Sequence, residues 1–199
     1  MSKKISLHET RRARIKLNIL KSALELIGSG AFDELFVGQI CERAEVSRVT
    51  FFKYFPKKED LLVYFMSLWS LEWAVQQARS PKRGLAAIYS LFGKAADYQN
   101  KPGSFLSLIG SIARLSTPPR QPEITAAERR ILYPDYPEAM DFKILGLNDI
   151  FAAHLAEARE IGEIETEEAG EEMIEILFTV FYGAPLAVHI RSRSDLMTS

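Results

Sequence analysis

Basic side chains gather at the beginning of the chain, where their chemistry would be the binding of anions. Residues 1–24 contain seven Lys or Arg and one acid, Glu9. Residues 1–62 hold 12 Lys and Arg against 8 Asp and Glu, a net charge of +4, whereas residues 63–199 hold 13 against 18, a net charge of −5. Such an end is attracted to a polyanion while the rest of the chain is repelled. The same residues also fit a solvated basic helix face, so charge alone leaves both interpretations open.

Catalytic and metal-binding patterns are missing from the sequence. The histidines His8, His154 and His189 are far apart, and none has the spacing His-x-x-His or Glu-x-x-His of a metal site. His154 and Glu157 can share one helix face, but such a pair is more often solvated than metal-bound. The sequence has neither a Gly-x-Ser-x-Gly turn nor a glycine-rich phosphate loop. It therefore predicts no enzyme, no catalytic residue, no metal site and no cofactor.

The composition is that of an ordinary globular protein. The 199 residues are 47% hydrophobic and 26% charged, and the chain is long enough to bury a sizeable core. The single Cys41 excludes a disulfide framework and a zinc site built from cysteines. No apolar run reaches the roughly 18 residues of a membrane span, and no apolar signal-peptide core follows the basic N-terminus. We therefore expect a cytoplasmic protein without a membrane partner.

Three short helices are expected to position the basic residues. Apolar residues recur at helical spacing and glycine or capping residues separate the runs, which predicts helices at 11–28, 37–44 and 47–55. Ser47 is a natural N-cap for the third helix. Phe51 and Phe55, four residues apart, would anchor that helix to the core. Only a tight turn separates the second and third helices, as in a helix-turn-helix that binds DNA.

The rest of the chain also has helical periodicity and no strand signal. The pattern predicts further helices at about 61–79, 84–98, 103–115, 125–132, 138–160 and 167–191. The fold class is therefore all-α, with about nine helices. We expect a helix-turn-helix domain at residues 1–62 and a second helical domain at residues 63–199.

Residues 37–62, VGQICERAEVSRVTFFKYFPKKEDLL, resemble the DNA-binding signature of tetracycline-repressor (TetR) type transcriptional regulators. The family pattern has an Ile-Ala pair, Ala-Gly-Val-Ser, a Gly-Thr pair, an aromatic residue, an aromatic-Phe pair and Lys-x-x-Leu. The resemblance covers about 50 residues, roughly a quarter of the chain, with several positions in register. Chain length, the single N-terminal helix-turn-helix and the all-α remainder also agree.

The sequence departs from the family pattern at five positions. Cys41 replaces an alanine, and Glu45 replaces the glycine of the turn, where a positive φ would cause strain. Val49 replaces the glycine before the threonine. Phe52 replaces a common tyrosine and lacks its hydroxyl, and Phe36 stands where many members have a capping threonine.

The resemblance implies a set of DNA contacts. Thr50 and Tyr54 match positions whose hydroxyls donate to phosphate. Lys58 matches a lysine that holds phosphate at the start of the fourth helix, or it is a solvated lysine of the first turn. Arg48 would contact guanine or only phosphate, and Val49 a thymine methyl. Gln39 would reach base or phosphate from the second helix. The complete predicted set is Gln39, Ser47, Arg48, Val49, Thr50, Lys53, Tyr54 and Lys58.

The basic residues Arg11, Arg12 and Arg14 have two interpretations. They form either an arm along the DNA backbone or minor groove, or a disordered basic tail. Charge and sequence position are consistent with both.

The resemblance also implies a homodimer on a pseudo-palindromic double-stranded operator, with its recognition helices about 34–36 Å apart. The last two helices would form the dimer surface. One stripe contains Ile144, Leu147, Ile150, Phe151 and Leu155, and the other Ile174, Leu177, Phe178, Phe181, Gly183 and Ala184. Part of each stripe must instead be intramolecular core.

A small apolar effector is expected to bind in a pocket formed by helices four to eight, in the second domain. The predicted pocket residues are Trp69, Trp73, Tyr89, Phe92, Phe105, Ile109, Phe178 and Tyr182, with plain core as the alternative for each. These expectations describe a dimeric DNA-binding transcriptional regulator, a repressor that the effector releases from its operator. The alternative is a helical protein-interaction module whose helix-turn-helix no longer binds DNA.

Overall fold

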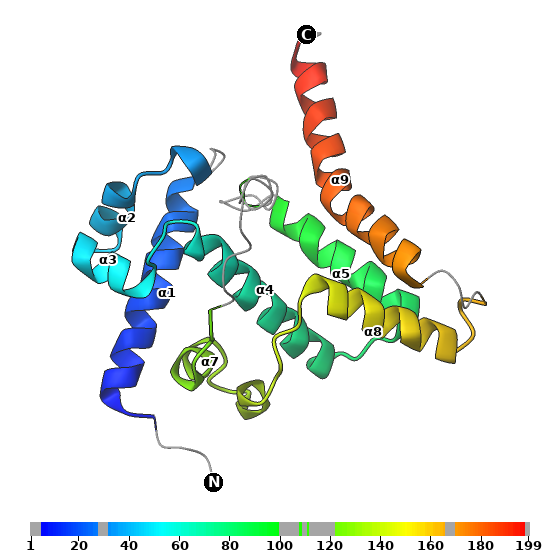
Figure 1. Ribbon diagram of the computed structural model, residues 1–199, viewed down its shortest axis with the longest axis horizontal. Helices are drawn as coiled ribbons and strands as arrows, with labels where there is room; N and C mark the ends of the chain where they lie inside the picture. Colours follow the sequence, from blue (N-terminus) through cyan, green and yellow to red (C-terminus); the bar gives the residue numbers. More distant parts are fainter. Residues whose placement is uncertain are drawn as a thin grey trace.

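The protein is all-α, as the sequence predicts. The computed structural model describes residues 5–27, 32–99, 108, 111, 122–165 and 170–197, and within them it has eight α-helices, two short 3-10 helices and no strand (Figure 1). None of the helices in these ranges is both long and apolar enough to cross a membrane. The predicted helix at 103–115 lies outside the described residues, apart from Leu108 and Ser111.

The N-terminal domain consists of α1 (Leu7–Ile27), the 3-10 helix η1 (Phe32–Glu34), α2 (Val37–Arg43) and α3 (Arg48–Tyr54). Helix α1 begins one turn earlier than the periodicity predicts. The Ser6 hydroxyl accepts a hydrogen bond from the Glu9 N–H at 3.1 Å, and the Glu9 carboxylate accepts one from the Ser6 N–H at 2.8 Å. This reciprocal capping box satisfies backbone groups at the helix start, so the helix can begin there.

Helix α1 braces the helix-turn-helix from behind. The Asn18 side chain donates to the Ala44 carbonyl at 2.9 Å, and Arg43 forms an ion pair with Glu25 at 2.9 Å. Phe51 and Phe55, 0% and 1% exposed, pack into the core behind α3, as their spacing predicts. The recognition helix is therefore fixed by burial on one side and leaves its other side open.

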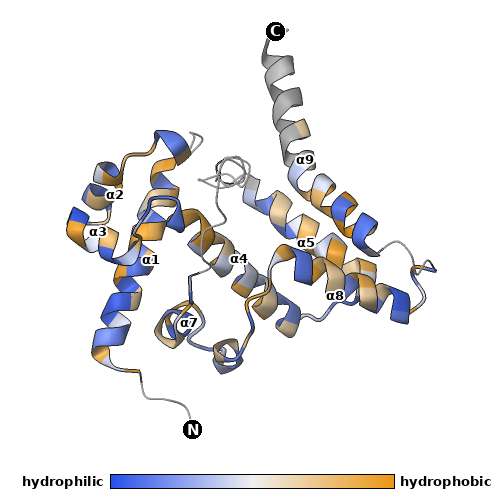
Figure 2. Cartoon of the chain, viewed as in Figure 1, coloured by the Kyte–Doolittle hydropathy of each residue, from blue (hydrophilic) through white to orange (hydrophobic). Residues whose placement is uncertain are grey.

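Helix α4 (Asp60–Arg79) connects the N-terminal domain to the C-terminal domain, which contains α5 (Gly84–Gln99), α7 (Ala126–Leu132), α8 (Leu147–Glu160) and α9 (Gly170–Met197). The predicted boundary at residue 62 falls in the first turn of α4, and one buried hydrophobic cluster extends from α1 to α9. Figure 2 shows the contrast between the largely hydrophobic α4 and the hydrophilic first half of α1. Helix α5 packs against α8 and α9, whereas α7 packs against α1.

The predicted continuous helix at 138–160 is wrong. A short 3-10 helix, η2 (Pro137–Met140), is followed by a non-helical segment, and α8 begins only at Leu147. The carbonyls of Ala139 and Phe142 accept hydrogen bonds from the buried guanidinium of Arg129 at 2.6 and 2.8 Å. These two carbonyls accept hydrogen bonds from a side chain outside the segment and not from the N–H groups of a continuing helix. The periodicity along the segment does not reveal this.

The turn between α2 and α3 contains a side chain in the left-handed region. Glu45 has φ of +55° and is the only non-glycine residue with a positive φ in the described ranges. The N–H groups of Glu45 and Val46 donate to the carbonyls of Glu42 and Cys41, which closes the end of α2. The turn therefore has the glycine-type geometry expected there, with glutamate occupying the glycine position.

Glycine in place of Glu45 should stabilise the protein. A side chain in the left-handed region costs about 1–2 kcal/mol, partly offset because glycine gives the unfolded chain more freedom. We expect Glu45→Gly to raise the free energy of unfolding in urea by about 0.5–1 kcal/mol. The control Glu42→Gly, inside α2, should lower that free energy instead. An E45G variant less stable than the wild type would show that this turn holds no strain.

Candidate nucleic-acid interface

Four residues of α3 form an exposed face opposite the buried phenylalanines. They are Arg48, Val49, Phe52 and Lys53, at helix positions that project together, and Val49 is 82% exposed. The sequence predicts that Arg48 and Lys53 project from this helix, and the structure places both on the exposed side. Phe52 is also exposed, in agreement with the spacing of Phe51 and Phe55, which assigns only those two phenylalanines to the core.

Ser47 and Thr50 begin the recognition helix. Ser47 is its N-cap, as the sequence predicts, and its hydroxyl accepts a hydrogen bond from the Thr50 N–H at 3.1 Å. The two hydroxyl oxygens lie 2.9 Å apart and share a further hydrogen bond. Thr50 is half-buried. These hydroxyls therefore already stabilise the helix start, and either can still offer a lone pair or proton to an approaching group.

The Arg48 guanidinium lies close to the backbone of α2 at Gly38. A Cβ atom built on Gly38 would lie 3.1 Å from Arg48 Nη2. Gly38 leaves this space free, so the guanidinium lies beside the beginning of α2. Gln39, one residue later, is exposed, and its side-chain oxygen accepts a hydrogen bond from the Phe36 N–H at 2.9 Å. Gln39 thus satisfies the N–H of the N-cap residue, whereas the Phe36 side chain cannot accept the hydrogen bond that a threonine at position 36 would accept.

Lys58 has a different environment from the one predicted. Its ammonium donates to three backbone carbonyls, those of Phe32, Asp33 and Leu35, at 3.2, 3.1 and 3.1 Å. It also lies 4.9 Å from the centroid of the Phe32 ring. An ammonium has three protons, and these carbonyls use all of them. Lys58 therefore ties the start of α4 to η1, and we infer a structural role for it in place of the phosphate contact.

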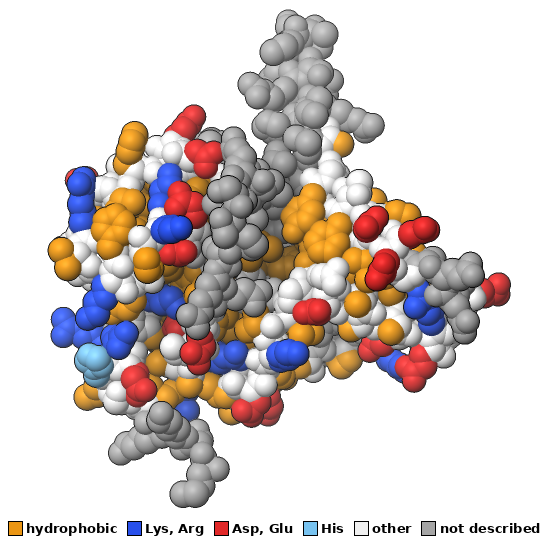
Figure 3. Space-filling view, in the orientation of Figure 1, with side chains coloured by type: hydrophobic (Ala, Val, Ile, Leu, Met, Phe, Trp, Pro, Cys, Tyr) orange, Lys and Arg blue, Asp and Glu red, His pale blue; other side chains and the backbone are white. Residues whose placement is uncertain are grey.

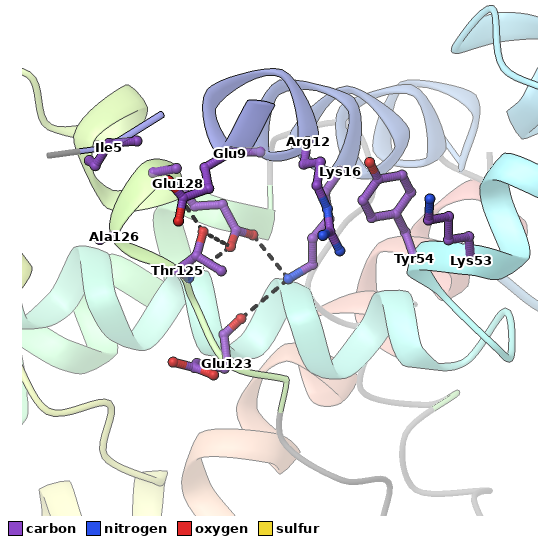
Figure 4. Close-up of a pocket in the computed structure, with 12 residues that line it drawn as sticks. Ile5, Glu9, Arg12, Lys16, Lys53, Tyr54, Glu123, Thr125, Ala126 and Glu128 are labelled. Atoms are coloured by element: carbon purple, nitrogen blue, oxygen red, sulfur yellow. Dashed lines mark hydrogen bonds and ion pairs between the residues drawn. The ribbon is translucent and has the colours of Figure 1, made fainter. Parts of the chain in front are cut away.

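A cleft of about 530 Å³ lies where α1, the end of α3 and α7 meet (Figure 4). Arg12, Lys16, Lys53 and Tyr54 line it from the N-terminal domain. Arg12 and Lys53 are exposed and form no ion pair with any described residue. Figure 3 shows Lys and Arg side chains clustered on this side of the molecule. The exposed face of α3 thus continues into a basic rim on α1, which Arg12 forms.

Of the predicted effector-pocket residues, two form packed core and three are half-buried among other aromatic rings. Trp69 and Trp73 are 2% and 3% exposed, and the ring of Phe92 lies 6.1 Å from Phe151 and 5.5 Å from Phe181. Phe178 and Tyr182 stack at 5.7 Å, and burial raises the pKa of the Tyr182 hydroxyl. Tyr89 is 76% exposed and faces solvent. Phe105 and Ile109 lie outside the described residues.

The predicted dimer stripes also contain both buried and exposed residues. Ile150, Phe151, Leu155 and Phe181 are at most 3% exposed and belong to the core of the chain. Among the α9 residues whose side chains the structure describes, Ile176 and Val180 are large, apolar and exposed, at 61% and 47%, and Ala184 and Ala187 are exposed along the same face. Of the predicted stripe on α9, Phe181 is buried and Ala184 is exposed, and the members between these extremes are half-buried: Ile174, Leu177, Phe178 and Gly183. Within the described ranges, no three His, Cys, Asp or Glu residues group as metal ligands would.

Comparison with known proteins agrees with this geometry. Residues 19–65 match the model of the family described as "Bacterial regulatory proteins, tetR family". The solved structure of Salmonella enterica GusR superposes with a TM-score of 0.55 and 19% sequence identity, covering 92% of this chain and 85% of that one. At this identity the likeness concerns the fold. No curated protein matches the sequence.

Removing the Lys58 ammonium should destabilise the protein. Lys58→Met keeps the apolar stem but leaves three carbonyls without their donor, and we expect a loss of about 1–3 kcal/mol in urea unfolding. Lys57→Met, at the exposed neighbour, should leave stability within about 0.5 kcal/mol of the wild type. If Lys58→Met instead folds normally and binds DNA with a weaker salt dependence, Lys58 holds a phosphate.

Proposed function

We propose that this chain, a DNA-binding transcriptional regulator of the TetR family, is a homodimeric repressor that a small apolar ligand releases from a pseudo-palindromic operator. Regulators of this family are not enzymes, in agreement with the sequence. The observation that carries the proposal is the exposed face of α3, with Arg48 and Lys53 directed away from a core that holds Phe51 and Phe55. DNA is its polyanionic partner, in the cytoplasm.

The residues of α3 divide into two roles in this proposal. Arg48 and Val49 lie at the N-terminal end of the helix, the end that contacts base edges in helix-turn-helix proteins. An arginine there donates to guanine, and a valine contacts the thymine methyl. Lys53 and Tyr54, at the other end, lie beside Arg12 at the basic rim and suit the phosphate backbone. Ser47 and Thr50 extend the phosphate contacts, and Gln39 holds α2 in position.

The partner subunit is proposed to bind the exposed face of α9. Ile176, Val180, Ala184 and Ala187 recur at the spacing of one helix face, and the small alanines permit close approach of a second helix. Large exposed apolar side chains on a long helix indicate an interaction surface. A two-fold axis there would make each subunit contribute the same stripe.

The effector is proposed to act on the aromatic cluster around Phe92, Phe178 and Tyr182. These three are half-buried, whereas their neighbours Phe151 and Phe181 are fully buried. A ligand that binds here with higher affinity in the state not bound to DNA would lower DNA affinity by the same coupling free energy. A titrated effector that binds without changing operator affinity would contradict the switch.

Selection of bound sequences from random duplex DNA tests the proposal as a whole. A symmetric pair of half-sites about one helical turn apart is expected. Binding in a gel-shift assay should weaken steeply with added salt, because phosphate contacts release counterions. The rival, a protein-interaction module without DNA affinity, would give no enriched sequence and no shift.

Substitutions on α3 should separate base contacts from phosphate contacts. Lys53→Gln should weaken binding to all sequences alike and reduce the salt slope by about 1. Arg48→Ala should cost about 1–3 kcal/mol and relax the preference at one base pair. Lys143→Gln, an exposed cation of the C-terminal domain, is the control and should change neither. Equal weakening by Arg48→Ala on every sequence would restrict Arg48 to phosphate.

A charge on the exposed stripe of α9 should dissociate the dimer. Ile176→Glu would place a carboxylate opposite its own symmetry copy in an apolar interface. We expect the mass measured by light scattering to fall to that of one chain, 22.5 kDa. Ile161→Glu, at an exposed isoleucine outside the stripe, should leave the dimer intact. A dimeric I176E variant would place the interface on another surface.

A further inference from the structure

A buried carboxylate joins three helices where the two domains meet. Glu128 of α7 is 1% exposed, and its Oε1 lies 3.0 Å from Lys16 Nζ of α1. The same oxygen accepts a hydrogen bond from the Tyr64 hydroxyl of α4. The other oxygen, Oε2, accepts hydrogen bonds from the Thr125 N–H and hydroxyl at 2.7 and 2.6 Å (Figure 4). One oxygen therefore holds α1 and α4, while the other caps α7.

The partners of Glu128 continue to the recognition helix. The side chain of Lys16 is only 13% exposed, and its ammonium also donates to the Glu123 carbonyl and lies 3.9 Å from the centroid of the Tyr64 ring. The Tyr64 ring packs against Phe55 with centroids 5.5 Å apart, and Phe55 packs against Phe51 at 5.9 Å. An unbroken chain of contacts thus leads from α7 to the buried side of α3.

Arg129, the residue after Glu128, joins α7 to the segment that precedes α8. Arg129 is 9% exposed, and its guanidinium donates to the carbonyls of Ile124, Ala139 and Phe142 at 3.2, 2.6 and 2.8 Å. The last two carbonyls belong to η2 and to the segment that leads into α8. Helix α8 packs against α9, which carries the proposed dimer face. Glu128 and Arg129 therefore connect the N-terminal domain, through α7 and α8, to the helix that carries the proposed dimer face.

This arrangement resists small displacements. Moving α1 away from α7 would separate Lys16 from Glu128 and leave each of these largely buried charges without its opposite charge, which is more costly than bending an exposed ion pair. Side-chain packing alone would permit a slide of α7 along α1 more readily. The buried pair thus selects one angle between the domains.

We propose that Glu128 is the positioning residue that sets the angle of the recognition helix relative to the dimer face, and thereby the half-site spacing that the dimer accepts. The inference rests on the proposed homodimer. Glu128 makes no contact with DNA and acts through Lys16, Tyr64 and Phe55. A change of one base pair in spacing rotates one half-site by about a tenth of a turn relative to the other, so a fixed angle makes the dimer selective.

The double variant Lys16→Met/Glu128→Gln tests this role without an unpaired buried charge. The introduced glutamine still completes the capping box with Thr125, and the introduced methionine still packs on the Tyr64 ring. The measurement is affinity for the selected operator, for derivatives with one base pair added or removed at its centre, and for an isolated half-site. The wild type should lose at least about tenfold in affinity on either change of spacing. The double variant should keep the wild-type thermal midpoint and half-site affinity, but lose less than about threefold.

A control variant and the opposing outcomes distinguish an effect on the position of the recognition helix from an effect on the stability of the protein. Glu160→Gln removes the carboxylate of an exposed ion pair, Arg83–Glu160 at 2.6 Å, and should leave the spacing preference unchanged. A folded double variant that discriminates spacing as the wild type does would overturn the positioning role and leave a purely structural pair. A wild type without any spacing preference would overturn the dimeric operator itself, a distinguishable failure.

Discussion

The structure depends on the burial of Phe51 and Phe55 behind a recognition helix of only seven residues. An isolated helix shorter than about 12 residues is marginal in water, so α3 exists because its apolar side is buried and Ser47 caps its first turn. The same burial directs Arg48 and Lys53 to the outside. The Lys58 clamp on η1 and the brace from α1 keep that small unit in one geometry. The proposed DNA-binding surface is thus a consequence of core packing.

The two domains share one hydrophobic cluster, yet polar contacts fix their angle. Apolar packing between α1 and α7 is not directional, whereas the Glu128 carboxylate accepts from Lys16, Tyr64 and Thr125 in fixed directions. Burying that charge is costly, which makes the arrangement specific even where it adds little net stability. On the opposite side of α7, the buried guanidinium of Arg129 likewise donates directional hydrogen bonds to backbone carbonyls. Arg129 contacts the segment that leads into α8, and α8 packs against α9, so the helix proposed to form the dimer is linked to α3 through α7.

Local pattern in the amino-acid sequence is enough to predict the all-α class, the helix-turn-helix and the exposed face of α3, because these follow from periodicity and caps. The start of α7 shows the same locality, since Thr125 and Glu128 form a recognisable capping box. Within the described residues, the approximate helix ranges other than 138–160 also follow from local pattern. Packing of the whole chain settled what the pattern left ambiguous: which face of α9 is exposed, and that the aromatic side chains Trp69 and Trp73 are core.

The roles of Lys58, Glu128 and Arg129 emerge only in the folded chain. Each binds side chains or backbone carbonyls outside its own helix, and no helical spacing within the sequence encodes such contacts. The non-helical segment before α8 also depends on such contacts, because its carbonyls accept hydrogen bonds from Arg129, whereas periodicity predicts a helix there. Local pattern fixes which backbone groups pair within a turn. The positions of distant charges depend on how the helices pack together, which is a property of the whole chain.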